Sequence, residues 1–257
     1  MARRGDLAAP PAPPLILAST SPRRREILEQ LRIPFDVVVP QYEEGSGDPV
    51  EHAVGKARSV GAFDDRPVLG CDTEVICDGR VFGKPENETD AEEMLDSLAG
   101  KTHEVVSGLA LLTPAWEEVH REVTLVTFRP LDARDLAHYV ASGEWEGRAG
   151  AYAIQGLGAS LVERLEGDYL NVVGLPGALL VRLLAQRFPG VYGFGWSRRR
   201  PVQDGHVRGR HVRGQTPDMA KTVSGLGRGA APRERMSGTT PALAPDHERT
   251  ARGAIRG

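Results

Sequence analysis

The sequence predicts an α/β fold in which a mixed, twisted sheet is flanked by helices. Short apolar runs alternate with helical patterns along the chain, which is typical of α/β proteins. Hydrophobic residues make up 40% of the 257 residues but aromatic residues only 5%, so aliphatic side chains and alanine must build the core. Two long β runs, Val105–Leu112 and Val119–Phe128, are joined around Pro114, which predicts an antiparallel pair.

The first predicted elements are a strand and a helix. Leu15–Ala18 is a short apolar run, and a helix is expected to follow from Pro22 to about Leu31. Ser21 is a favourable N-cap residue, and proline is well suited to the first helical position. The next elements are a strand at Phe35–Val39 and a helix at about Pro49–Val60.

The middle of the chain predicts a buried strand and a hairpin. Val68–Cys71 is apolar, and we place Asp72 and Thr73 at the carboxyl end of that strand. Val75–Phe82 is expected to form a hairpin that turns at Asp78-Gly79, because Asp-Gly favours two-residue turns.

The second half predicts three further helices and one strand. Thr89 is the expected cap of a helix that ends at Leu98, because Glu92 completes a capping-box pattern. The remaining elements are a helix from Asp132 to about Ala141, a strand at Leu161–Leu165 and a closing helix at Leu175–Arg187.

We expect one domain, residues 14–190, between two disordered segments. Residues 1–13 are rich in proline, and residues 195–257 are rich in arginine, glycine and proline without apolar periodicity. Residues 198–257 hold 13 Lys+Arg against 5 Asp+Glu, whereas residues 1–197 hold 19 against 30. The expected domain is therefore acidic and the tail basic.

Composition also limits the functional classes. A basic Arg/Gly tail can bind RNA or membrane phosphates, but this tail has no aromatic residue beyond Trp196 to stack on bases, so we do not expect nucleic-acid binding. No apolar run reaches membrane-spanning length, which argues against a membrane protein. The chain has two cysteines, which indicates a reducing compartment, and we expect the cytoplasm.

The segment Ser19-Thr20-Ser21-Pro22-Arg23-Arg24 predicts a phosphate site. A strand ends here, hydroxyl groups follow, and a helix begins with two arginines beside the positive end of its dipole. A phosphate would meet free backbone N–H groups, hydroxyls and guanidinium groups together. The alternative is a solvated basic helix start with Glu26 and Glu29 as partners.

Three further segments carry candidate site residues. Asp72 can hold Mg²⁺ or activate a water, although a single aspartate at a strand end is often only part of a turn. Lys84 lies between glycine and proline, so it is either a positioned cation or an exposed turn lysine. Gln155, in a segment of small residues, offers a donor and an acceptor to a base edge, unless this segment is only a loop.

Taken together and in this order, the motifs resemble the Maf family of nucleotide pyrophosphatases. The resemblance extends from about Leu15 to Leu184. The segments that carry it are Ser19–Arg24, Glu43-Glu44, Lys56-Ala57, Gly70–Thr73, Gly83–Pro85, Leu98–His103, Ala149–Gly156 and Gly167–Pro176.

The resemblance implies a fold of two lobes around a central nucleotide cleft, as in the Maf and ITPase proteins. It also implies metal-dependent hydrolysis of nucleoside triphosphates between the α- and β-phosphates, with Mg²⁺ or Mn²⁺ as the cofactor. By position, the implied catalytic residues are Asp72 as proton acceptor, Lys56 and Lys84. The implied metal ligands are Glu43 and Asp72, and the implied substrate-binding residues are Ser19, Ser21, Arg23, Arg24, Thr73 and Gln155.

The resemblance further suggests a substrate. Arg23 after the Ser-Pro pair and the Tyr152–Gly156 segment match the branch that acts on dTTP and UTP. A pyrophosphatase for modified nucleotides and a non-catalytic, nucleotide-binding regulator of cell division remain alternatives. We expect the triphosphate as the partner and leave a homodimer open.

Overall fold

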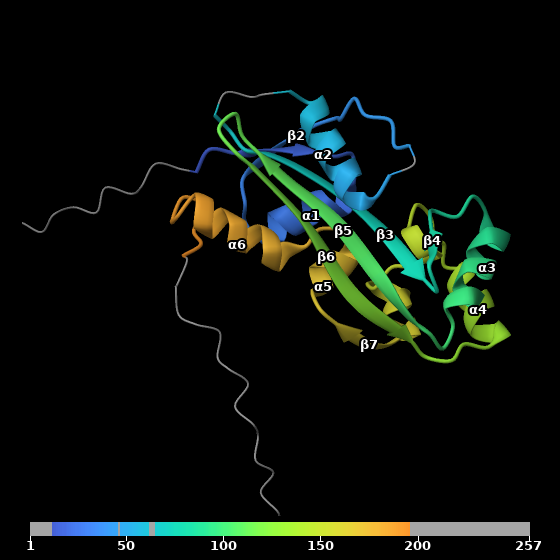
Figure 1. Cartoon of the computed structure of the whole chain (residues 1–257). Helices are drawn as coiled ribbons and strands as arrows, with labels where there is room; N and C mark the ends of the chain where they lie inside the picture. Colours follow the sequence, from blue (N-terminus) through green and yellow to red (C-terminus); the bar gives the residue numbers. More distant parts are fainter. Residues whose placement is uncertain (1–11, 46, 62–64, 196–257) are drawn as a thin grey trace, which may run out of the picture. The chain divides into compact units, whose positions relative to one another are not determined.

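The computed structural model describes residues 12–45, 47–61 and 65–195. A seven-stranded sheet holds β2, β1, β3, β5, β6 and β7 side by side in that order, and β4 pairs with β3 (Figure 1). The strands are β1 (Leu15–Ala18), β2 (Phe35–Val38), β3 (Val68–Cys77), β4 (Arg80–Phe82), β5 (Thr102–Leu112), β6 (Glu117–Phe128) and β7 (Val162–Glu166). The α-helices are α1 (Pro22–Gln30), α2 (Pro49–Ser59), α3 (Glu88–Leu98), α4 (Ala133–Val140), α5 (Tyr169–Val173) and α6 (Gly177–Arg187). Two 3₁₀ helices are η1 (Ala149–Ala151) and η2 (Gly156–Leu161).

The sheet is mixed, which confirms the predicted fold class. β1 is parallel to both β2 and β3, and the pairs β3–β5, β5–β6 and β6–β7 are antiparallel. The predicted hairpin at the end of β3 is also present. Asp78 and Gly79 form its turn with φ angles of 51° and 77°, as a two-residue hairpin turn with left-handed residues requires.

β3 corrects one prediction that bears on the site. The sequence places Asp72 and Thr73 at the end of a short strand, but β3 continues to Cys77 and joins the hairpin without a break. The reason is β5, which pairs with β3 from Val68 to Ile76 and supports the longer strand. The parallel partner β1 ends opposite Gly70, so Asp72 still lies just beyond the carboxyl end of β1.

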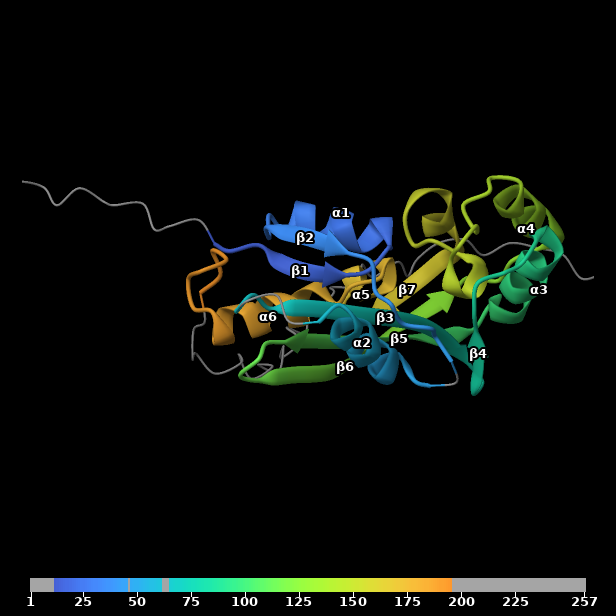
Figure 2. The ribbon, with the colours of Figure 1, turned by 90° about the horizontal axis from the view of Figure 1, so that it is seen from above.

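Helices cover the two faces of the sheet. On one face, α2 packs over a small apolar cluster that includes Ile16, Ala53 and Ala110. The larger cluster lies on the other face, with α1 and α6 contributing Ile27 and Leu180. Helices α3 and α4 lie together at the end of the long strands where β4 turns back, away from α6 (Figures 1 and 2).

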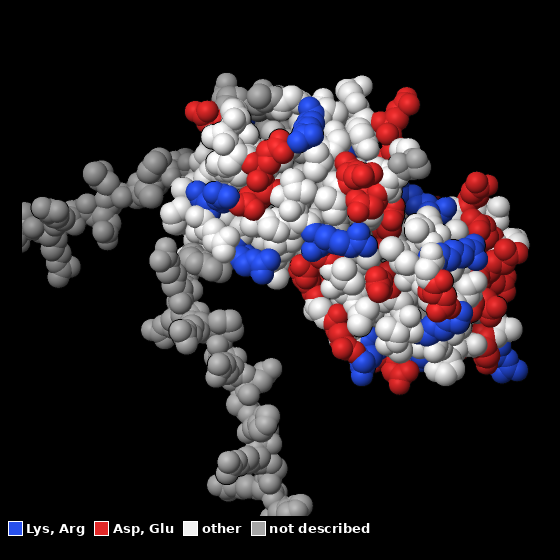
Figure 3. All heavy atoms as spheres, viewed as in Figure 1, with Lys and Arg blue, Asp and Glu red and all other residues white. Residues whose placement is uncertain are grey.

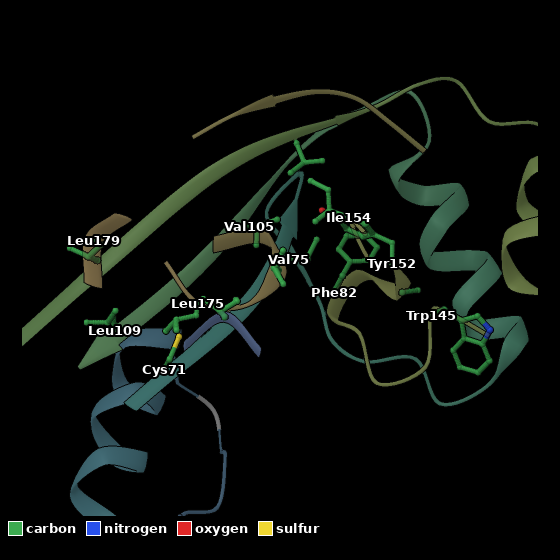
Figure 4. Close-up of a cluster of buried hydrophobic side chains, with 14 of the residues drawn as sticks. Cys71, Val75, Phe82, Val105, Leu109, Trp145, Tyr152, Ile154, Leu175 and Leu179 are labelled. Carbon is green, nitrogen blue, oxygen red and sulfur yellow. The ribbon is translucent and has the colours of Figure 1, made fainter. Parts of the chain in front are cut away.

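The larger cluster continues toward α3, α4 and the 3₁₀ helices. Phe82, Tyr152 and Ile154 are buried close together beside Val75 (Figure 4). Because Tyr152 and Ile154 belong to the predicted specificity segment, Tyr152–Gly156, this apolar packing fixes where that segment lies relative to β3.

The helices differ from the sequence predictions at α3 and at α5. Asn87, not Thr89, caps α3, and its side chain accepts a hydrogen bond from the N–H of Asp90 at 3.0 Å. Asn87 competes well for this role because its amide oxygen reaches the N3 backbone. The short helix α5 was not predicted, since its five residues are too few to show a period.

The described chain is longer at both ends than the predicted domain. Ala12 packs against the larger cluster, and the Tyr192 hydroxyl donates to the Pro13 carbonyl at 3.0 Å. Residues 12, 13 and 191–195 are thus part of the described structure. The disorder predicted for residues 1–11 and for the tail from residue 196 concerns residues outside the described part.

Charge is unevenly distributed on the described surface. Acidic side chains gather over the end that holds α3 and α4, where α3 carries Glu88, Asp90, Glu92, Glu93 and Asp96 (Figure 3). No helix in the described part of the chain is both long enough and apolar enough to cross a bilayer.

Candidate active site

A gap along one edge of β3 forms the centre of the candidate site. On that edge, β1 pairs with residues 68–70 and β4 with residues 75–77, so residues 71–74 have no neighbouring strand there. A cavity of about 840 Å³ opens against this gap, and its lining includes Asp72, Thr73 and Glu74. Cavities of this size are typical of small-molecule sites.

The cavity brings together nearly all of the predicted site residues. Its lining includes Ser19, Ser21, Arg23, Arg24, Lys56, Asp72, Thr73, Lys84 and Gln155. Glu43 is not in this lining and is exposed, whereas its neighbour Glu44 lines the cavity. The structure therefore places Glu44, rather than the predicted Glu43, at the site.

The start of α1 leaves hydrogen-bond donors free toward the cavity. Ser21 occupies the N-cap position, but its side chain makes no capping bond. Ser19 Oγ instead accepts from the N–H of Ser21 at 3.1 Å and from Arg24 Nη1 at 3.2 Å. The first backbone N–H groups of a helix have no partner within it, so those of Arg23 and Arg24 remain available to an anion.

Asp72 is buried in a network of cations from two helices. Lys56 Nζ, on α2, lies 2.5 Å from Asp72 Oδ1, and Arg24 Nη2, on α1, lies 3.9 Å from the same oxygen. Lys56 Nζ also lies 2.5 Å from Glu44 Oε1. These contacts compensate the buried charge of Asp72 and fix the orientation of its carboxylate.

Close packing of α2 on the sheet brings Lys56 to Asp72. A Cβ atom at Gly70 would lie 2.1 Å from the Ala53 carbonyl oxygen, and one at Gly108 would lie 2.1 Å from that of Pro49. Only glycine allows such an approach of helix to strand. Asp72 follows Gly70 by two residues, so its side chain points to the same face, toward α2.

The other oxygen of Asp72 faces a histidine that sequence reasoning did not include. His52, one turn before Lys56 on α2, is buried, and its Nδ1 lies 3.3 Å from Asp72 Oδ2. Glu74, on the same face of β3, completes a group in which ligand atoms of His52, Asp72 and Glu74 all lie within 4.8 Å of one another. The chemistry of this donor set fits a divalent metal.

Three cations face the cavity without an acidic partner. Arg23, Lys84 and Arg148 line it, and none of them forms an ion pair within the described residues. Burial, and next the charge of Arg148, lower the pKa of Arg23 to about 10. An anion bound between Arg23 and Arg148 would relieve this repulsion. The sequence alone assigned no role to Arg148.

Thr73 points away from Asp72, toward the opposite face of the sheet. Its hydroxyl lies 2.8 Å from Ser107 Oγ and 3.4 Å from the Gly174 carbonyl oxygen. The same carbonyl accepts from Arg24 Nε at 3.0 Å. Gly174 adopts φ = 133°, a conformation that other residues rarely adopt, so this loop is shaped to hold Arg24 and Thr73 together.

The segment around Gln155 is held on both sides while its own side chain is free. The N–H of Ala153 donates to the Tyr139 hydroxyl at 3.0 Å, and Tyr152 OH lies 2.9 Å from His103 Nε2. Beyond Gln155, the Glu144 carboxylate accepts from the N–H groups of Leu157 and Gly158. Gln155 lines the cavity with its amide unpaired within the described chain.

His103 contacts the segment around Gln155 through Tyr152. It is 1% exposed, lies against Phe128 and Tyr152, and its pKa is lowered by burial to about 4. The imidazole is therefore neutral at physiological pH, as a buried ring beside a phenol requires.

The fold and this arrangement together define an α/β protein with a cavity lined by arginine and lysine side chains and by a buried carboxylate. Within this class, a family model described as Maf-like protein matches residues 14–187, and the chain belongs to the Maf-like protein family.

Similar proteins support the assignment over most of the chain. The chain is 46% identical to a dTTP/UTP pyrophosphatase of Symbiobacterium thermophilum over 180 residues, which cover 67% of this chain and 93% of that protein. It is 44% identical to a dTTP/UTP pyrophosphatase of Deinococcus radiodurans over 196 residues, which cover 74% of this chain and 100% of that protein. A solved structure, the Ham1 protein of Staphylococcus aureus, has a TM-score of 0.36 and 12% identity over 45% of this chain and 72% of that chain, too little to add to the assignment.

Proposed function

We propose that this protein hydrolyses nucleoside triphosphates to the monophosphate and pyrophosphate, with dTTP and UTP as its preferred substrates. The observation that carries the proposal is one cavity that combines a buried carboxylate, Asp72, with three cations that have no acidic partner among the described residues. The names of the relatives, dTTP/UTP pyrophosphatases, support the same activity.

The cationic side chains would bind the triphosphate. Its negative charges repel a nucleophile, so charge neutralisation and positioning should dominate catalysis. The free N–H groups at the start of α1, with Ser19 and Ser21, would hold one phosphoryl group. Arg23, Lys84 and Arg148 would hold the others and stabilise the departing pyrophosphate.

Asp72 would act on the attacking water. Its carboxylate would accept a proton as the water oxygen bonds to the α-phosphorus, and the bond to the bridging oxygen would break with its electron pair leaving on pyrophosphate. Lys56 and Arg24 hold this carboxylate in place from two sides.

A divalent cation, Mg²⁺ or Mn²⁺, is expected as the cofactor, and Asp72 is the predicted ligand that lies in the cavity. When bound, such a cation neutralises phosphate charge. Glu43, the other predicted ligand, is exposed outside the cavity, so we do not propose it further.

Gln155 would recognise the base. Its unpaired amide can donate to and accept from the O4/N3 edge of thymine or uracil. The bonds on both sides of Gln155 hold its backbone before the substrate binds, which lowers the entropy cost of recognition.

A substrate panel tests the proposal. The purified protein, with Mg²⁺ and with Mn²⁺, is incubated with each common triphosphate, and pyrophosphate release is measured. We expect dTTP and UTP to give the highest kcat/KM, and Gln155→Ala to lower kcat/KM for these two more than for the purine triphosphates. Preference for GTP-type substrates would contradict the role of Gln155.

The same assay separates the alternatives. Higher kcat/KM for modified pyrimidine nucleotides than for dTTP would favour a pyrophosphatase that removes such nucleotides. Pyrophosphate release at background with both metals would favour a nucleotide-binding regulator of cell division. The cytoplasm remains the expected compartment.

A further inference from the structure

The face of β3 that points toward α2 carries three metal-ligand side chains in one place. Asp72 and Glu74 are two residues apart on the strand, so both point to this face. His52 comes from the facing surface of α2. The ligand atoms of these three residues all lie within 4.8 Å of one another, and all three residues line the cavity.

The two oxygens of Asp72 are divided between different partners. Oδ1 contacts Lys56 at 2.5 Å, whereas Oδ2 lies 3.3 Å from His52 Nδ1. Two donors that each bind a metal at about 2.1 Å lie roughly 3 Å apart when they are adjacent in its coordination sphere. The separation of Asp72 Oδ2 and His52 Nδ1 is close to this value, and Lys56 contacts Oδ1 rather than Oδ2.

Glu74 lacks the cation that Asp72 has. Within the described chain it forms no ion pair and no hydrogen bond through its carboxylate, although it is half-buried beside the Asp72 charge. A partly buried carboxylate next to a second one is costly unless a cation lies between them. On α2, the side chain that completes the group is His52, which offers a ring nitrogen as a metal ligand.

We propose that His52, Asp72 and Glu74 bind a divalent metal ion, and that this ion is Mn²⁺ or Co²⁺ in preference to Mg²⁺. An imidazole ligand determines this preference, because Mg²⁺ favours oxygen ligands and a histidine nitrogen suits transition metals better. This metal site lies in the proposed active site, so a role of the ion in catalysis rests on the proposed function. Binding of the ion itself requires no nucleotide.

The test is metal binding by the full-length protein without nucleotide. We measure Mn²⁺ affinity by titration calorimetry for the unmodified protein and for His52→Gln and Glu74→Gln, and thermal unfolding without metal checks that each variant is folded. We expect each variant to bind Mn²⁺ at least about tenfold more weakly, since even indirect support of a ligand is worth about 10–100-fold in affinity. The preference for Mn²⁺ over Mg²⁺ should shrink in His52→Gln.

Matched controls and a spectroscopic readout make the result specific. His138→Gln removes an exposed imidazole from α4, and Glu104→Gln removes a carboxylate opposite Ile76 on β5, so both should bind Mn²⁺ normally. Nitrogen hyperfine coupling to bound Mn²⁺ should be present in the unmodified protein and absent in His52→Gln.

Several outcomes would overturn the proposal. They are no Mn²⁺ binding without nucleotide, unchanged affinity in both variants, or coupling that persists in His52→Gln. Hydrolysis of dTTP, assayed separately with excess Mg²⁺, shows whether the proposed function fails as well. Active enzyme with unaltered metal binding in the variants would reject the ligand set and leave the proposed function intact.

Discussion

Asp72 receives contacts from two helices, because Lys56 on α2 and Arg24 on α1 both approach its Oδ1. Its oxygens are therefore oriented before a substrate binds. A carboxylate held in this way can accept a proton in a fixed direction, and loss of its charge should affect the transition state more than binding.

Replacing Asp72 tests its role as proton acceptor. We expect Asp72→Asn to lower kcat for dTTP by about 10²–10⁴-fold, the usual effect of removing a general base, with a smaller change in KM. Asp96→Asn, an exposed position on α3, is the control and should keep full activity. A loss of only a few-fold in folded Asp72→Asn would contradict the assignment.

His103 predicts a pH dependence of stability. Burial lowers its pKa from 6.5 to about 4, so the unfolded chain takes up a proton at a higher pH than the folded one. The free energy of unfolding should thus fall as pH drops from 6.5 to 4, by up to about 3 kcal/mol from this residue, and should not depend on it above 6.5. In urea unfolding, the free energy of unfolding of His103→Phe should increase relative to that of the unmodified protein as the pH falls from 6.5 to 4. A constant difference between the two proteins would count against this account.

The candidate site residues differ in how clearly their sequence context marks them. Asp72, Arg23, Lys84 and Gln155 lie in segments whose glycine, proline or strand-end context marks them, and the structure places them in one cavity. His52 carries no such mark, because a histidine within an amphipathic helix predicts nothing about which side chain it meets. Glu43 and Glu44 are adjacent in sequence, so only the path of the loop shows which of them faces Lys56.

At the level of elements, the site depends on how closely α2 approaches the sheet. Gly70 and Gly108 lie on neighbouring strands, and each leaves room for α2 backbone atoms. The sequence predicted α2 and β3 but not their separation, because that distance depends on glycines from two strands meeting under one helix. The length of β3 was misjudged for a similar reason, since β5 extends it through pairing distant in sequence.

Adding a methyl group at Gly70 tests this packing. A Cβ there would lie 2.1 Å from the Ala53 carbonyl oxygen, so α2 must move. We expect Gly70→Ala to cost about 1–3 kcal/mol of unfolding free energy, as overpacking usually does, and to lower kcat because Lys56 is displaced from Asp72. Gly45→Ala adds the same group where nothing lies within 4 Å, and should change stability by less than about 0.5 kcal/mol. Equal effects in both variants would contradict the packing argument.

At the scale of the whole molecule, the candidate site lies within the segment that the family model matches. The cavity-lining residues fall between Ser19 and Gly174, and the match covers residues 14–187. The mixed sheet was predictable from the alternation of elements. The way in which distant segments meet around the cavity was not, because periodicity does not show it.

A truncated chain that ends at Gly195 tests whether the basic tail contributes to the chemistry. We expect its kcat and KM for dTTP to equal those of the full-length protein, because every cavity-lining residue is retained. Salt-dependent RNA binding that is present in the full-length chain and lost on truncation would instead assign the tail a nucleic-acid function.

The position of bond cleavage tests the central claim most directly. Hydrolysis of dTTP in water enriched in oxygen-18, followed by mass spectrometry, shows which phosphorus the water attacks. Attack at the α-phosphorus predicts equal amounts of dTMP and pyrophosphate, with the heavy oxygen in dTMP. Release of dTDP and phosphate, or the heavy oxygen in pyrophosphate, would contradict attack at the α-phosphorus in this cavity.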